Sequence, residues 1–222
     1  MRSRRRHPVR RAESQAMIVL GIDPGTANTG YGVVERRGGR LTALDGGVIT
    51  TRPEAPMQIR LSNIHRRVCE LLDEHSVSVV SMEDIYFGRN ASSAFSVGQA
   101  RGVVMLAAGQ RRLPCISYTP QQVKYSVCGS GRAEKDQVGR MVQMLLALET
   151  VPRPDHAADA LAIAICHATG APHAAAVAES AVAGPPAPPA APARHEPEQF
   201  DELDEIDATS NVEDIHIYRR PA

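Results

Sequence analysis

The stretch GIDPGTANTGYGVV, residues 21–34, decides the fold that the sequence predicts. It joins two short apolar runs, 18–22 and 30–34, through a turn of small residues, and such runs are typical of buried strands. Asp23 stands where the first run ends and is followed by Pro-Gly. A carboxylate fixed at the end of a rigid strand, facing an open turn, is well placed to bind a metal ion. The same residue also suits a turn whose amides it satisfies, or a loop that cradles phosphate.

Outward from this stretch, the apolar pattern predicts a meander of three strands and then strands that alternate with helices. The Gly38-Gly39 pair suits a tight hairpin turn between the second strand and the third. This order is typical of an α/β fold, so we expect a mixed five-stranded sheet flanked by helices. The expected strands are 18–22, 30–34, 41–51, 77–82 and 114–118, and the expected helices are 57–75, 91–111, 120–128, 133–148 and 156–168.

The chain of 222 residues suits one domain with tails, and we expect that domain to span residues 17–170. Residues 1–16 contain six arginines and no apolar period, which predicts a disordered basic arm. Met17 begins the first apolar run and is therefore a second candidate for the true start of the protein. Residues 171–222 are first rich in alanine and proline and then acidic, which predicts a disordered tail.

Composition excludes several classes of protein. No apolar run approaches the roughly 20 residues that cross a bilayer, and the arginine-rich start lacks the apolar stretch of a secretory signal. The four cysteines form no C-x-x-C pair, which argues against a zinc site and predicts reduced thiols in a cytoplasmic protein. The formal net charge of zero does not by itself predict a nucleic-acid partner.

Further carboxylates stand where they could join Asp23. Glu83 ends the apolar run 77–82, so it emerges at the same edge as Asp23 if the two strands are neighbours. His156 and Asp159 are three residues apart and share one face of a helix that is otherwise apolar. A buried carboxylate needs a cation or hydrogen-bond donors. Solvated strand ends and helix caps, with Asp155 as the cap, are the alternative interpretation of these residues.

Such a set of ligands suits hard divalent cations, which prefer oxygen. Two ions about 4 Å apart activate a water and stabilise the leaving oxygen when a phosphodiester is cleaved. We therefore expect two Mg²⁺ or Mn²⁺ ions per active site, and a histidine ligand suits Mn²⁺ better. The predicted catalytic residues and metal ligands are Asp23, Glu83, His156 and Asp159.

Aromatic and basic residues near these carboxylates suggest contact with nucleic acid. Tyr86 and Phe87 are adjacent in a chain with only 4% aromatic residues, and aromatic side chains stack on unpaired bases. Ordinary core packing is the alternative for this pair, and a solvated helix face is the alternative for each basic residue. The candidates for phosphate contact are Arg89, Arg101, Lys124, Arg132 and Lys135.

Taken together, these segments resemble the RuvC family of bacterial Holliday-junction resolvases. The matching segments are GIDPGTANTGYGVV at 21–34, MEDIYFGRN at 82–90, VGQARG at 97–102, the segment 120–135, and DHAADALAIAICH at 155–167. They stand in the family's order and at its spacing, and they cover essentially all of 17–170.

The resemblance implies a ribonuclease-H-like fold and a symmetric homodimer whose two active sites nick opposed strands of a four-way DNA junction. It places Asp23, Glu83, His156 and Asp159 on the family's catalytic positions. Tyr86 falls on or next to the aromatic that contacts the junction centre, and Lys124 and Lys135 fall on basic DNA contacts. The implied partners are the branch-migration proteins RuvA and RuvB. Some members carry Asp where His156 stands, so the neighbouring Asp155 could share its role.

The leading hypothesis is therefore a crossover junction endodeoxyribonuclease of recombination and DNA repair. Two-metal hydrolysis would make paired symmetric nicks with 5′-phosphate and 3′-hydroxyl ends. A sugar-kinase-like or actin-like ATPase needs two such domains, and a core of about 150 residues is short for it. Two further hypotheses are a related ribonuclease-H-like nuclease that acts on structured RNA and a binding module that recognises junctions without cutting them.

Overall fold

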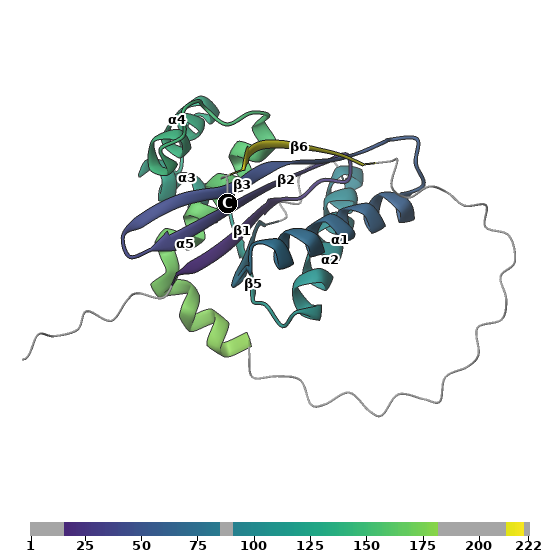
Figure 1. Ribbon diagram of the computed structural model, residues 1–222, viewed down its shortest axis with the longest axis horizontal. Helices are drawn as coiled ribbons and strands as arrows, with labels where there is room; N and C mark the ends of the chain where they lie inside the picture. The colour runs from purple at the N-terminus through teal and green to yellow at the C-terminus, as the bar shows by residue number, and fades with distance from the viewer. Residues whose placement is uncertain (1–15, 85–90, 182–211, 220–222) are drawn as a thin grey trace, which may run out of the picture.

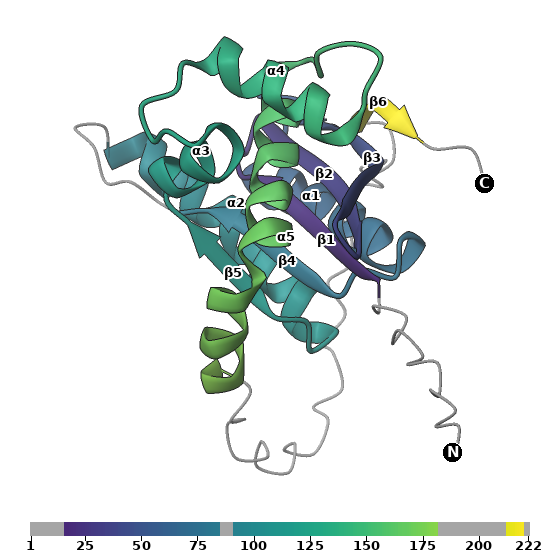
Figure 2. The same ribbon diagram turned by 90° about the vertical axis from the view of Figure 1, so that its left-hand side faces the viewer.

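A mixed sheet forms the centre of the computed structural model, which describes residues 16–84, 91–181 and 212–219, and helices cover both faces of the sheet (Figures 1 and 2). The strands are β1 Met17–Asp23, β2 Asn28–Arg37, β3 Arg40–Thr51, β4 Val79–Glu83, β5 Cys115–Tyr118 and β6 Val212–Arg219. The helices are α1 Met57–Glu74, α2 Ala91–Gln110, α3 Pro120–Cys128, α4 Lys135–Leu146 and α5 Asp155–Ala181.

The strand order β5-β4-β1-β2-β3-β6 makes β1 and β4 neighbours, so the predicted site lies at one end of the sheet, where these two strands finish. Strands β1, β2 and β3 form the expected antiparallel meander, and Arg37 pairs with Arg40 across the hairpin turn. Strands β1, β4 and β5 run parallel to one another. Because Ile22 of β1 lies opposite Met82 of β4, the next residue of each strand, a carboxylate, leaves the sheet at the same end.

Each face of the sheet has its own apolar core. Leu20 and Ile22 of β1 point to the face covered by α1 and α2, whereas Val19 packs on the side of α3, α4 and α5. This alternation follows from the period of two along a strand. The side chains of β1 in both cores are fully buried, so packing on both faces of the sheet holds β1 rigidly.

Helix α5 lies directly on β1 and β2 because glycines face it. A Cβ at Gly21 would overlap the carbonyl oxygen of Ala160 and would stand 2.9 Å from the Cβ of Ala164. A Cβ at Gly30 would overlap the carbonyl oxygen of His156. The backbone of the helix therefore touches the sheet itself, and its first turn is pinned beside the ends of β1 and β2.

The predicted five-stranded mixed sheet flanked by helices is confirmed by β1 to β5 and the helices around them. In the segment 171–222, which the sequence predicts to be disordered, the structure describes two elements: α5 continues to Ala181, and Val212–Arg219 forms β6. The short run I-H-I-Y alternates as a strand does, but only the free edge of β3 gives it a partner. Residues 1–15 lie outside the described residues. In the described part of the chain, no helix is long and apolar enough to cross a membrane.

The contact between α5 and β1 gives a prediction for stability. Replacing Gly21 with alanine should lower the free energy of unfolding by about 1–3 kcal/mol or more, because the helix must move off the strand. Gly39→Ala is the matched control, since a Cβ at Gly39 would have nothing within 4 Å. Urea unfolding of both variants measures the difference. Equal unfolding midpoints would contradict the close packing of α5 on β1.

Candidate active site at one end of the sheet

Three elements bring four predicted residues to one end of the sheet. Asp23 ends β1 and Glu83 ends the neighbouring parallel strand β4. His156 and Asp159 come from the first turns of α5, which lies on β1. These residues are far apart along the chain, so their proximity is a product of the fold.

Asp23 and His156 are in direct contact. The Nδ1 atom of His156 lies 2.7 Å from Oδ2 of Asp23, whose side chain is only 16% exposed. The hydrogen bond that His156 donates to the Asp23 carboxylate raises the pKa of His156 above its usual value, although burial acts in the opposite direction. The contact joins the end of β1 to the first turn of α5.

Glu83 carries the clearest electrostatic signature of the site. Burial, together with the negative charges of Asp23 and Asp159, raises the pKa of Glu83 to about 7. Lys135 and Lys124 oppose this shift. Burial likewise raises the pKa of Asp159, which Lys135 partly offsets. A group of half-buried carboxylates that repel one another is a favourable place for a cation.

Lys135, the first residue of α4, already supplies one positive charge. Its Nζ atom lies 3.1 Å from Oδ2 of Asp159 and 3.3 Å from Oδ2 of Asp155. Burial would lower the pKa of Lys135, but the hydrogen bonds that it donates to Asp159 and Asp155 outweigh burial and raise that pKa. Asp155 thus pairs with Lys135, whereas the side chain that contacts Asp23 is His156.

The four side chains form an open set of ligands. They offer three carboxylates and one imidazole, which fits Mg²⁺ or Mn²⁺. They do not include three ligand atoms that all lie within 4.8 Å of one another, and within the described ranges only Asp45, Glu74 and His75 meet that criterion. An open set suits ions whose remaining coordination positions are filled by water and substrate oxygens.

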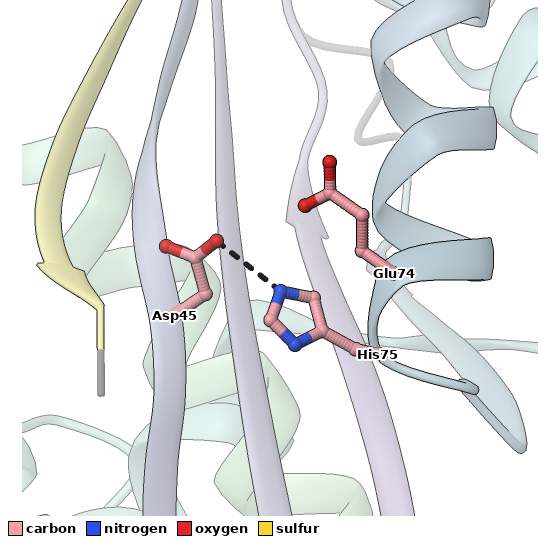
Figure 3. A group of neighbouring side chains, drawn as sticks. All are labelled: Asp45, Glu74 and His75. Atoms are coloured by element: carbon pink, nitrogen blue, oxygen red, sulfur yellow. Dashed lines mark hydrogen bonds and ion pairs between the residues drawn. The ribbon is translucent and has the colours of Figure 1, made fainter. Parts of the chain in front are cut away.

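The cluster of Asp45, Glu74 and His75 lies between β3 and the end of α1 (Figure 3). Oδ2 of the fully buried Asp45 lies 3.2 Å from Nε2 of His75, and its other oxygen accepts a hydrogen bond from the Gly46 amide. Glu74 pairs with Arg67. Each acid thus has a nitrogen partner, as buried charges require. We assign this cluster a structural role, which is to tie α1 to β3.

Two cavities open beside Lys135 and Asp159. One, of about 210 Å³, places Glu83 and Lys124 over an apolar floor; its lining is Glu83, Pro120, Val123, Lys124, Lys135, Val138, Asp159, Ala162 and Ile163. The other, of about 220 Å³, adds two arginines that the sequence did not single out, Arg140 and Arg153. Nothing in the local pattern marks them, because one lies on α4 and the other in the loop before α5.

Arg101 of α2 has internal partners. Its Nη1 atom donates to the carbonyl oxygen of Glu83, and Nη2 donates to Oγ of Ser117 on β5 at 2.9 Å. Its side chain is only 11% exposed. The geometry favours a role in holding the end of β4 over the phosphate contact that the sequence predicts for this residue.

The other predicted DNA contacts divide into two groups. Lys124 and Lys135 line the cavities beside the carboxylates, and Arg132 stands in the loop between α3 and α4, with its backbone amide bonded to Ser130. Tyr86, Phe87 and Arg89 lie outside the described residues. Tyr125 is a further exposed aromatic, and only its place next to Lys124 in the sequence could have drawn attention to it.

Comparison with known proteins gives one consistent family. The family model described as crossover junction endodeoxyribonuclease RuvC matches residues 19–167. A crossover junction endodeoxyribonuclease RuvC from Desulfitobacterium hafniense is 50% identical over 152 residues, which cover 68% of this chain and 92% of that protein. A protein of the same name from Moorella thermoacetica is 49% identical over 156 residues, covering 70% and 93%.

Solved structures agree with the sequence comparison. The RuvC of T. thermophilus in complex with a Holliday junction substrate superimposes with a TM-score of 0.68 at 42% identity, covering 71% of this chain and 96% of that one. A structure of Thermus thermophilus RuvC reaches a TM-score of 0.66 at 42% identity, covering 71% and 97%. The matched part is the sheet and helices that carry the site.

The contact between Asp23 and His156 predicts a pH response in the metal-free protein. Asp23→Asn should lower the pKa of His156, measured by NMR titration in EDTA, because it removes the charge that raises it. In the wild type the pair stabilises the fold fully below about pH 6.5, and this contribution is lost as the pH rises through the raised pKa of His156. Asp155→Asn is the control, since Asp155 pairs with Lys135. An identical His156 pKa in wild type and Asp23→Asn would contradict the contact.

Proposed function

Because this chain belongs to the RuvC family of crossover junction endodeoxyribonucleases, we propose that it is a metal-dependent nuclease that resolves Holliday junctions in recombination and DNA repair. The observation that carries the proposal is the convergence of Asp23 and Glu83, from neighbouring parallel strands, with His156 and Asp159 of α5. The RuvC of T. thermophilus was solved with a junction substrate, which supports DNA over RNA as the substrate.

In this proposal Asp23, Glu83, His156 and Asp159 hold two ions, either Mg²⁺ or Mn²⁺. At these residues, bound ions would supply an activated water and a counter-charge for the leaving oxygen, and hydrolysis would leave 5′-phosphate and 3′-hydroxyl ends. The raised pKa of Glu83 supports the assignment, since a cation favours the ionised form that burial and neighbouring acids disfavour. The imidazole of His156, in contact with Asp23, suits Mn²⁺ better than Mg²⁺.

We propose that the basic residues around the carboxylates contact the phosphates of the DNA. Lys124 and Lys135 line one cavity beside Asp159, and Arg140 and Arg153 line the other. Positive charges on both sides of the carboxylates would orient a DNA backbone across them. Arg101 acts as a positioning residue, because its bonds to Glu83 and Ser117 fix the end of β4 against β5.

Paired symmetric nicks require two active sites, and α2 offers a surface for a homodimer. Its inner face is buried through Ala100, Val104 and Ala107. Phe95 and Met105 stand on the opposite face, 70% and 52% exposed. Apolar residues repeated along the exposed side of a helix are typical of a helix that packs on another. We place the second copy of the chain there.

The wider setting of the reaction rests on the family alone. We propose that the protein acts in the cytoplasm and that the branch-migration proteins RuvA and RuvB deliver its junction. The arm 1–15 has no part in the proposed chemistry.

The function is tested with a synthetic four-way junction and either ion. Wild type should cut opposed strands, and Asp23→Asn should lose roughly a hundredfold or more in rate, since a catalytic metal contributes several kcal/mol. Asp155→Asn should retain most activity, because its partner is Lys135. Junction binding in EDTA should survive in both variants. Cleavage by Asp23→Asn at the wild-type rate, or none by wild type with either ion, would overturn the proposal.

The dimer is tested by charge at the exposed face of α2. Met105→Glu should convert a dimer into a monomer in analytical ultracentrifugation and should turn paired nicks into single, uncoordinated ones. Met144→Glu is the matched control, because Met144 is likewise an exposed methionine, at 72%, on α4. A dimer that persists in Met105→Glu but not in Met144→Glu would move the interface to α4.

A further inference from the structure

Without β6, β3 would be the edge strand of the sheet, and two features that protect such strands are present in it: the irregular pairing with β2 at Val33/Val34 and the inward-pointing Asp45. Residues 41–51 read LTALDGGVITT, with no lysine, arginine or proline. The one charge, Asp45, points inward to His75 and is fully buried. An edge strand that presents unpaired N–H and C=O groups, with no lysine or proline along it, can still pair with another strand.

The chain's own C-terminal strand occupies this edge. β6 runs antiparallel to β3, from Val212 opposite Thr51 to Arg219 opposite Asp45. The register shifts between Gly46 and Gly47, where β6 contains one extra residue. Figure 2 shows β6 alongside β3, at the side of the sheet away from β5. The pairing covers Asp45 to Thr51, a stretch of β3 that contains no lysine, arginine or proline.

The register suits the residues of this segment. Ile215 lies opposite Val48, and Tyr218 lies opposite Gly46, a position with no side chain of its own. An aromatic residue across from a glycine is a favourable cross-strand pair. The alternating pattern of β6 therefore matches this edge of β3.

The strand is attached as a tethered ligand would be. Of the elements that the structure describes, only β3 packs closely against β6. Residues 182–211 join it to α5, and a connection of about 30 residues can reach up to about 100 Å. Tethered ligands act at effective concentrations on the order of millimolar, so modest intrinsic affinity is enough for docking. The match to the family model ends at residue 167, before this strand begins.

We propose that the β3 edge is a strand-addition site for an extended peptide, and that Val212–Arg219 occupies it in cis. The occupant keeps the edge from pairing with the same strand of a second copy. The site is separate from the nuclease centre, because β2 stands between β3 and β1.

The test is a full-length variant with consecutive prolines, Ile215→Pro and His216→Pro. Successive N–H groups of a strand point to opposite sides, so one of the two prolines must remove a bond to β3. The matched control carries Ala208→Pro and Thr209→Pro, before the strand begins. Hydrogen exchange is measured over residues 45–51, together with sedimentation at rising protein concentration and junction cleavage.

In the strand variant, exchange over 45–51 should become roughly tenfold faster or more, and the protein should form larger assemblies than wild type. Adding a synthetic peptide of residues 211–220 should restore slow exchange and suppress the assemblies, whereas a peptide with the two prolines should not. The control variant should behave as wild type, and all three proteins should cut junctions at the same rate. Unchanged exchange in the strand variant would overturn the docking, and fast exchange without assemblies would overturn its protective role.

Discussion

The site depends on one packing constraint, the direct contact of α5 with β1 and β2. At Gly21 and Gly30 the helix backbone comes so close that no Cβ fits between them. This contact places the first turn of α5 beside the end of β1, where Asp23 meets His156 at 2.7 Å. A helix held by interlocking side chains would stand further from the sheet, since helices packed through side chains lie 8–10 Å apart axis to axis. The ligands would then be separated.

The same closeness creates the electrostatic problem that defines the chemistry. Asp23, Glu83 and Asp159 are gathered in a partly buried space, where burial and mutual repulsion raise the pKa of Glu83 to about 7. Two of the acids have a nitrogen partner: Asp159 contacts Lys135, and Asp23 contacts His156. Each of these contacts is made through one carboxylate oxygen, Oδ2 of Asp159 and Oδ2 of Asp23. In the proposed enzyme the repulsion that destabilises the empty cluster is what makes it bind divalent cations.

The local sequence patterns could predict the candidate residues of this site but not their arrangement in space. Apolar runs end at Asp23 and Glu83, and the spacing of His156 and Asp159 places them on one helical face. Which strands are neighbours, and how close the helix lies, are properties of tertiary packing that a local pattern does not contain. For this reason the sequence did not single out Arg140 and Arg153, which line a cavity beside Asp159, and did not show that Arg101 bonds to the carbonyl of Glu83. The assignment of catalytic roles stays a prediction.

The C-terminal strand β6 is another feature that the local sequence pattern could not predict. The composition of the tail predicted disorder, and a run such as I-H-I-Y cannot form a strand alone, because a strand is stable only on a partner. The partner is the edge of β3, where Asp45 faces inward to His75 and leaves the outer side without charge. The contact between Asp45 and His75, which ties α1 to β3, thus leaves the outer edge of β3 available for pairing with β6. Since β2 separates this edge from β1, an added strand can cover it without moving the carboxylates at the ends of β1 and β4. A family fold can therefore acquire a tail strand at β3 without a cost to its active site.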